Sequence, residues 1–239
     1  MSDTTGMGTA VSRMQANIPV GPGLHGDLAV PRDPIGVTLF AHGSGSGRFS
    51  PRNRLVANAL NRHGIATLLF DLLTHDEEAQ QANVFDVELL GERLEQTTRW
   101  LMEHPLAEGL APSYFGASTG AAAALRAAAN LGPLVRAVVT RGGRPDLAGD
   151  GIEHVVSPTL LIVGSRDETV LDLNRQAYAR LSCTRQLVVV HRAGHLFEEP
   201  GTLEPVAELT GNWLVRSYEE GDAAALDLGE LETEPAATD

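Results

Sequence analysis

Short apolar runs alternate with longer segments of helical periodicity along most of this 239-residue chain. The runs are apolar at nearly every position, which is typical of strands buried on both faces of a parallel sheet. We expect strands at residues 36–41, 66–70, 112–116, 137–140, 159–163 and 186–190. Helical patterns fall at residues 53–63, 87–103, 119–131, 170–181 and 202–218. This alternation predicts an α/β fold with a mostly parallel sheet and helices on both faces.

The segment ahead of the first of these strands has a different pattern. Residues 16–30 contain Gly21-Pro22-Gly23, a turn signal between two extended stretches, which predicts an antiparallel hairpin on the sheet edge. We expect residues 1–15 to be a flexible N-terminal segment and residues 16–218 to form one domain. About 17 residues separate the strand that ends at Thr140 from the one that begins near Pro158. That connection is too short for a large lid domain, so we expect an open site.

Charge and hydropathy exclude several classes of partner. The formal net charge is −13, and residues 219–239 contain eight acids and no base. Nucleic acids are bound by clustered basic residues, so we expect no nucleic-acid partner. No apolar run approaches the length of a membrane span and no signal-peptide pattern opens the chain, which predicts a cytoplasmic protein without a membrane partner. We expect residues 219–239 to be a solvated, disordered tail.

Cysteine and lysine usage narrows the chemistry further. Cys183 is the single cysteine, so no internal disulfide can form, and we expect a partly buried thiol there rather than a nucleophile. All 18 basic residues are arginine. The absence of lysine excludes Walker-type phosphate loops and Schiff-base catalysis.

A GxSxG motif, Gly116-Ala117-Ser118-Thr119-Gly120, leads from an apolar strand into an alanine-rich helix. In that context the motif predicts a nucleophile elbow with Ser118 at its tip. Small neighbours relieve the crowding of a sharp turn between strand and helix. A catalytic serine also needs a histidine base and an acid that orients the histidine, and both should lie downstream in the order Ser, Asp, His.

Candidates for both partners follow the last two predicted strands. Asp167 is the expected acid and Glu168 the alternative, although an acid at the start of a helix also favours the helix dipole. His195 lies on a loop after a glycine and is the expected base. His191 and His195, four residues apart, are alternatively a zinc pair; that spacing requires a helix, so we expect no metal.

Acyl chemistry needs hydrogen-bond donors for the oxyanion. Residues 41–47, Ala-His-Gly-Ser-Gly-Ser-Gly, follow the strand at 36–41. We expect the donors to be the backbone amides of Ser44 and Thr119, the residue after the nucleophile. A phosphate cradle is the alternative, but the glycines are spaced GxGxG rather than GxGxxG. We expect His42 to support the turn.

Several polar residues follow strands that should end at the same sheet edge. We expect Arg48 and Arg141, with Arg144 nearby, to hold an anionic substrate, unless these side chains are solvated or salt-bridged. His75 and Asp76 have the same two interpretations.

The elbow, the acid loop, the histidine loop and the His-Gly loop are arranged as in the α/β-hydrolase superfamily, which the chain resembles over residues 16–218. Gly-His-Leu-Phe-Glu-Glu-Pro-Gly around His195 and His-Gly-Ser-Gly-Ser-Gly around Gly43 are most similar to dienelactone-hydrolase-like members. Similar domains also occur fused to phosphoribosyltransferases. Typical dienelactone hydrolases carry cysteine at the elbow, where this chain has Ser118.

The resemblance implies an enzyme that needs no cofactor. Its substrate would be a small molecule with an ester-type bond, namely a carboxylic ester, lactone or thioester, cleaved through a Ser-His-Asp triad and an acyl-enzyme. A non-catalytic α/β-hydrolase scaffold that binds a small molecule or a protein is the alternative, because a fold does not determine a function. The sequence makes no prediction of the oligomeric state.

Overall fold

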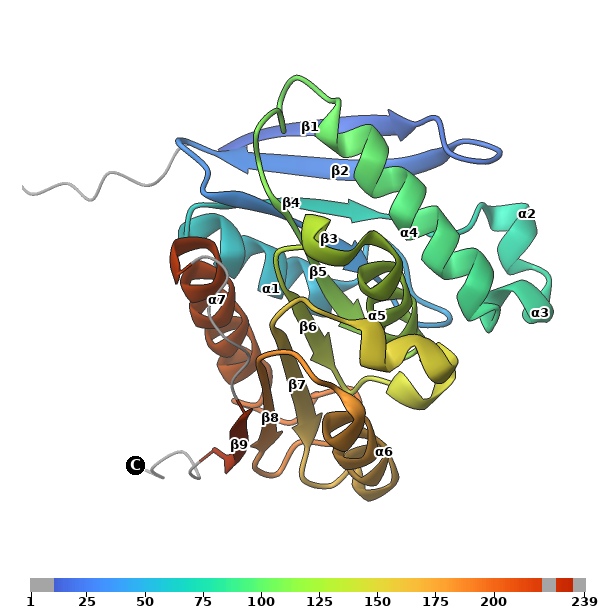
Figure 1. The fold of residues 1–239 in the computed structure, drawn as a ribbon. Coiled ribbons are helices and arrows are strands. Elements are labelled where there is room, and N and C mark those ends of the chain that lie inside the picture. Colours follow the sequence, from blue (N-terminus) through green and yellow to red (C-terminus); the bar gives the residue numbers. More distant parts are fainter. Residues whose placement is uncertain (1–10, 221–226, 234–239) are drawn as a thin grey trace, which may run out of the picture.

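The computed structural model describes residues 11–220 and 227–233. The strands in these ranges are Val11–Ile18 (β1), Leu24–Pro31 (β2), Gly36–Ala41 (β3), Ile65–Phe70 (β4), Pro112–Ala117 (β5), Val138–Arg141 (β6), Thr159–Gly164 (β7), Arg185–Val190 (β8) and Asp227–Glu232 (β9). They form one sheet in the order β1-β2-β4-β3-β5-β6-β7-β8-β9 (Figure 1). The β1–β2 and β2–β4 pairs are antiparallel, and the remaining neighbours are parallel.

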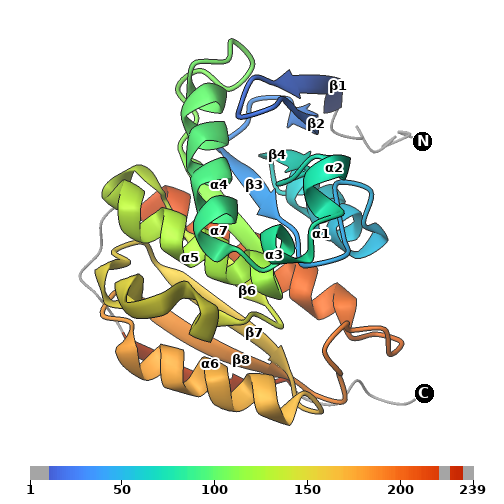
Figure 2. The ribbon, with the colours of Figure 1, turned by 90° about the vertical axis from the view of Figure 1, so that its right-hand side faces the viewer.

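Helices cover both faces of the sheet (Figures 1 and 2). Helices α1 (Pro51–Arg62) and α7 (Leu203–Glu220) pack on one face, and α4 (Val87–Met102), α5 (Thr119–Leu131) and α6 (Glu168–Arg180) pack on the other. Every residue of β3, β4, β5 and β7 is buried between these layers. This two-sided burial explains why the strands are continuous apolar runs in the sequence, and it confirms the predicted α/β class with a mostly parallel sheet and helices on both faces.

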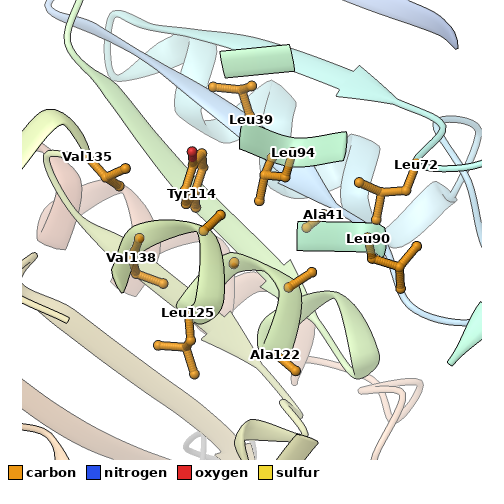
Figure 3. Packing of buried hydrophobic residues seen from close by; sticks show 14 of the residues in the cluster. Leu39, Ala41, Leu72, Leu90, Leu94, Tyr114, Ala122, Leu125, Val135 and Val138 are labelled. Carbon is orange, nitrogen blue, oxygen red and sulfur yellow. The ribbon is translucent and has the colours of Figure 1, made fainter. Parts of the chain in front are cut away.

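Tyr114 of β5 lies at the centre of the larger core (Figure 3). Its ring is fully buried among residues such as Leu39, Leu94 and Leu125, which come from β3, α4 and α5. Its hydroxyl lies 2.7 Å from the Thr98 Oγ1 atom of α4, so the buried polar group has a partner. Burial raises the pKa of Tyr114 because it disfavours the phenolate.

The helix boundaries follow from capping groups. Helix α1 begins two residues earlier than expected, at Pro51, because the Ser50 side chain accepts a hydrogen bond from the Asn53 amide and proline is favourable in a first turn. Two short helices that the pattern did not predict, α2 (His75–Glu78) and α3 (Gln81–Val84), lie beside the start of α4 (Figure 1). A capping box between Thr74 and Glu77 begins α2.

The connection from β6 to β7 forms the 3₁₀ segment η2 (Pro145–His154), and a second 3₁₀ turn, η1 (Gly132–Leu134), follows α5. Segment η2 packs against α5 and α6. Ala148 and Ile152 of η2 are buried in the core on that face. The short connection is therefore part of the domain body rather than a lid over the sheet edge.

The expectation for the N-terminal segment is wrong for residues 11–15. These residues belong to β1, which pairs with β2 from Val11 opposite Pro31 to Ile18 opposite Leu24. Backbone hydrogen bonding along the full strand, which the local pattern does not show, makes the hairpin longer than predicted. Residues 1–10 lie outside the described residues.

The expectation of a disordered tail from residue 219 is also wrong where the structure describes that segment. Helix α7 continues to Glu220, and residues 227–232 form β9, parallel to β8. Leu228 packs against the core, and the Glu230 carboxylate accepts hydrogen bonds from Arg175 of α6 at 2.8 and 3.0 Å. The ladder with β8 and these contacts order a segment whose composition is acidic. Residues 221–226 and 234–239 lie outside the described residues.

Within the described ranges, none of the helices combines the length and the apolar character that a membrane crossing requires.

Candidate active site

Ser118 lies at the tip of a sharp turn between β5 and α5. Its backbone is left-handed, with φ 51° and ψ −120°, a conformation that costs on the order of 1–3 kcal/mol in a residue with a side chain. A Cβ on Gly116 would lie 2.6 Å from the Ala121 Cα atom, and one on Gly120 would collide with the Ala41 and His42 carbonyl oxygens. The two motif glycines therefore allow the close approach of strand, helix and loop that holds the strained serine.

The structure brings Ser118, His195 and Asp167 together. The His195 Nε2 atom lies 3.2 Å from Ser118 Oγ, and the Nδ1 atom lies 2.6 Å from Asp167 Oδ2. Asp167 is the N-cap residue of α6, but its side chain makes no capping hydrogen bond. Its carboxylate is mostly buried and faces the histidine instead. The alternative acid, Glu168, is the first residue of α6, and the described side-chain hydrogen bonds of His195 go to Asp167 and Ser118 instead.

Glu199 holds the loop that carries His195. Its Oε2 atom accepts a hydrogen bond of 3.1 Å from the Gly194 amide, and this bond lowers the pKa of Glu199. Phe197 anchors the same loop, because its ring is buried although its φ is positive, at 54°. The sequence analysis predicts no role for Glu199. Its position four residues after the candidate base is the sequence feature that points to such a role.

His191 points to a different part of the structure. Its Nδ1 atom lies 3.4 Å from Glu232 of β9, whereas His195 contacts Asp167. Among the described residues, no group of three or more His, Cys, Asp or Glu side chains is arranged to hold a metal ion. The zinc alternative therefore has no support in the described geometry.

The loop after β3 is held by His42. Its Nδ1 atom lies 3.0 Å from the Gly43 carbonyl oxygen, and its Nε2 atom accepts a hydrogen bond of 3.0 Å from the Leu72 amide. Both ring nitrogens are thus engaged, so His42 supports the turn as expected. The Ser44 amide donates to Thr119 Oγ1 at 3.0 Å. Of the two expected oxyanion donors, Ser44 therefore already has a partner, whereas the Thr119 amide belongs to the first helical turn, whose N–H groups lack intrahelical partners.

A cleft of about 910 Å³ opens above Ser118 and His195. The loop at residues 43–47 forms one wall, and α2 contributes His75 and Glu78. Phe49 and Leu196 also line it and are 57% and 42% exposed, so the cleft offers apolar surface to a ligand. Asp76 is not among the lining residues.

The arginines expected at the rim have separate environments. Arg141 lines the cleft and is 6% exposed. Arg48 is not one of the lining residues, and its guanidinium forms an ion pair with Asp71. Arg144 is likewise outside the cleft and forms two hydrogen bonds with Asp146, at 2.7 and 2.8 Å. Arg52 of α1, which the sequence did not single out, lines the cleft together with Arg141.

Cys183 lies away from this site. Its thiol is buried beside Thr159 Oγ1, at 3.7 Å, and burial raises its pKa. The thiol is therefore more deeply buried than expected, and burial disfavours the thiolate, the form that acts as a nucleophile.

The chain matches no family model. It is 60% identical over 190 residues to proteins of two Mycobacterium tuberculosis strains, each named "Putative phosphoribosyl transferase". The match covers 80% of this chain and 43% of those proteins, so the chain spans less than half the length of these relatives.

Two solved structures are similar over nearly their whole length. A dienelactone hydrolase from Anabaena variabilis has a TM-score of 0.84 and 48% identity, over 86% of this chain and 98% of that one. An esterase domain from Rhodothermus marinus has a TM-score of 0.69 at 21% identity, over 87% and 98% of the two chains, and this likeness supports the fold alone.

The strand order and the similarity to the Anabaena structure define the fold as that of the α/β-hydrolases. The 48% identity to the Anabaena dienelactone hydrolase extends over 98% of that chain, which is enough to assign a family. The chain belongs to the dienelactone hydrolase family.

Proposed function

We propose that this protein is a serine hydrolase that cleaves an ester-type bond of a small molecule through an acyl-enzyme. The observation that carries this proposal is the continuous contact from Ser118 Oγ through His195 to Asp167, at 3.2 and 2.6 Å, on the wall of a large cleft. A serine at a strained elbow, a histidine within reach of its hydroxyl and a buried carboxylate behind the histidine are the parts that nucleophilic acyl transfer requires.

In the first step, His195 Nε2 accepts the Ser118 hydroxyl proton while Oγ attacks the carbonyl carbon. Asp167 keeps the Nδ1 proton in place and stabilises the imidazolium that forms. The tetrahedral intermediate then collapses, the bond to the leaving oxygen or sulfur breaks, and His195 returns the proton to the leaving group. In the second step, His195 activates a water molecule in the same way, and the acid product leaves Ser118.

The oxyanion would be stabilised by the Thr119 amide at the N-terminus of α5, where the helix dipole also favours negative charge. The Ser44 amide is the second proposed donor. It donates to the Thr119 hydroxyl in this structure, so the oxyanion would replace that hydroxyl as its acceptor. Gly43 allows this arrangement, because a Cβ there would lie only 3.0 Å from the Ser118 Cβ atom.

The test uses short p-nitrophenyl esters and a fluorophosphonate probe. Ser118→Ala should abolish probe labelling and lower kcat by several orders of magnitude. Ser182→Ala is the matched control, because the Ser182 hydroxyl bonds to the Glu153 carbonyl on the exposed surface and should not affect either readout. A Ser118→Ala variant with wild-type turnover would contradict the mechanism. A folded wild-type protein that reacts with neither the probe nor a broad ester panel would favour the non-catalytic scaffold.

A further inference from the structure

The chain at residues 141–144, where β6 ends, holds the backbone of the nucleophile elbow. The Ser118 amide donates a hydrogen bond of 3.3 Å to the Arg141 carbonyl oxygen, and the Ser118 carbonyl oxygen accepts one of 3.0 Å from the Arg144 amide. Ser118 has a strained, left-handed backbone, and such a residue keeps its conformation only where its surroundings restrain it. Residues 141–144, here called the elbow strap, supply this restraint on both sides of the serine.

The elbow strap also contacts the candidate base. Gly142 has a φ of 51°, and a Cβ on it would lie 3.0 Å from the His195 carbonyl oxygen and 3.4 Å from the Nδ1 atom of the ring. The backbone of the strap therefore packs directly against His195, beside the nitrogen that bonds to Asp167. Because the strap touches both Ser118 and His195, a displacement of it would move one relative to the other.

A buried asparagine of α6 fixes the elbow strap. The Asn174 Nδ2 atom donates hydrogen bonds to the Gly143 carbonyl oxygen at 2.9 Å and to the Val170 carbonyl oxygen, one turn earlier in α6, at 2.8 Å. The side chain is fully buried, and its Oδ1 atom has no hydrogen-bond partner among the described residues. Burying an unpaired oxygen is unfavourable, so the stabilising polar contribution of Asn174 comes from its two donated hydrogen bonds.

Asn174 lies on the same helix as the candidate acid. Asp167 is the N-cap residue of α6, about two helical turns before Asn174. One helix therefore carries the acid at its start and, through Asn174, bonds to the strap that holds the serine and backs the histidine. Asn174 itself is not one of the residues that line the cleft.

We infer that Asn174 is a positioning residue, which fixes the elbow strap so that Ser118 Oγ, the His195 ring and Asp167 stay aligned. This inference rests on the proposed serine-hydrolase function and extends it to a residue that touches no substrate. Catalysis by such a set depends on accurate placement, because a displacement of about 1 Å costs on the order of 100-fold in rate. The bond from Asn174 to Gly143 therefore contributes to kcat rather than to substrate binding.

Asn174→Thr tests the bond to the strap separately from the bond within α6. A threonine hydroxyl in a helix can bond to the carbonyl four residues earlier, here that of Val170. It has a single proton to donate, so the bond to Gly143 is lost. With p-nitrophenyl acetate, kcat should fall by about 10- to 100-fold. KM should be unchanged, because the lost interaction lies outside the cleft.

Asn61→Thr is the matched control. Asn61 is a buried asparagine of α1 whose Nδ2 atom also donates two hydrogen bonds, to the Ile65 carbonyl oxygen at 3.0 Å and to Thr67 Oγ1 at 3.1 Å. Its Oδ1 atom likewise has no partner in the described structure. Ile65 begins β4, at the amino ends of the parallel strands, whereas the site lies at their carboxyl ends. Both variants should lower Tm, but only Asn174→Thr should lower kcat.

Proton NMR gives a readout that does not need turnover. The proton in the short His195–Asp167 hydrogen bond, 2.6 Å between the heavy atoms, should resonate at low field. Asn174→Thr should shift or broaden this resonance and speed hydrogen exchange at the Arg144 amide, and Asn61→Thr should do neither. If Asn174→Thr does not fold, Asn174→Ser loses the same bond with a smaller side chain and takes its place.

These readouts separate the positioning role from the proposed reaction. A changed resonance and faster exchange in Asn174→Thr alone would support the positioning role even if every ester proved inert, and inert esters would then count against the hydrolase. Wild-type kcat in a folded Asn174→Thr variant would overturn the positioning role and leave the hydrolase standing. Equal losses of kcat in both asparagine variants would also overturn it, because lower stability alone would then explain them.

Discussion

The close approach of β5 to the start of α5 allows the effect of a substitution at Gly116 to be estimated. A Cβ on Gly116 would lie 2.6 Å from Ala121 Cα, 2.8 Å from the Gly120 carbonyl oxygen and 2.9 Å from the Ala121 amide nitrogen. Carbon atoms normally pack at about 3.5–4.0 Å, so roughly 1 Å of movement is required. All three neighbours are backbone atoms of the elbow, and no flexible side chain can move aside to relieve the contact.

We therefore expect Gly116→Ala to destabilise the protein by about 3 kcal/mol, the upper part of the usual range for overpacking. In a domain of this size, that loss corresponds to a fall in Tm of roughly 6–12 °C. The variant should also lower kcat on a short p-nitrophenyl ester by on the order of 100-fold, because a shift of about 1 Å at the helix start displaces the nucleophile.

The matched control is Gly151→Ala. Gly151 lies in η2 without a positive φ, and no described atom comes within 4 Å of the position that its Cβ would occupy. Its replacement should be neutral or stabilising by up to about 1 kcal/mol, because alanine restricts the unfolded chain. Differential scanning calorimetry of both variants decides the matter. At about 2–4 °C per kcal/mol, the expected loss of stability separates the melting temperatures of the two variants by several degrees. If their Tm values lie within about 1 °C of each other, the elbow is not as tight as argued.

Three further predictions concern single hydrogen bonds. Asp167→Asn should lower kcat by up to about 10⁴-fold with an unchanged circular dichroism spectrum, because an amide can favour the wrong histidine tautomer; a loss below tenfold would refute the assigned acid. Thr119→Val should remove the acceptor of the Ser44 amide and cost about 1 kcal/mol in urea denaturation, while Thr119→Ser should recover it; equal stability of both variants would contradict this. The hydrogen bond from Arg175 lowers the pKa of Glu230, so their pair stabilises the fold above the carboxyl's unfolded pKa and loses this effect as pH falls through the folded value. Because both side chains are partly exposed, Glu230→Gln should lower the free energy of unfolding at pH 7 by less than about 1 kcal/mol, and by a smaller amount at acidic pH; a pH-independent difference would argue against the pair.

The parallel strands were predictable because their burial produces an unambiguous pattern. β3, β5 and β7 are apolar throughout, and helices on both faces leave no polar side to interrupt them. The geometry around Ser118, Asp167 and His195 could be anticipated for a related reason. Each residue follows a parallel strand, and the carboxyl ends of parallel strands meet at one edge of the sheet.

Other features depend on partners that are distant in sequence. The acidic composition of residues 227–232 indicates a solvated tail, yet β8 supplies a ladder and Arg175 supplies a counter-ion for Glu230. From the sequence alone, Arg48 and Arg141 have equivalent positions, since both come after strands predicted to end at the same edge of the sheet. Asp71 neutralises the first, whereas no described acid pairs with the second.

The sequence alone thus determined the α/β architecture, the elbow at Ser118 and the order of its two partners. The reason is that the hydrophobic pattern and the succession of strands along the chain can be read directly from the sequence. Only the tertiary structure decided which arginine of the cleft pairs with none of the described acids, that the Ser44 amide bonds to Thr119, and that the described part of the acidic tail adds β9 to the sheet. Each of these depends on hydrogen bonds and charges between segments that come together only in the folded chain.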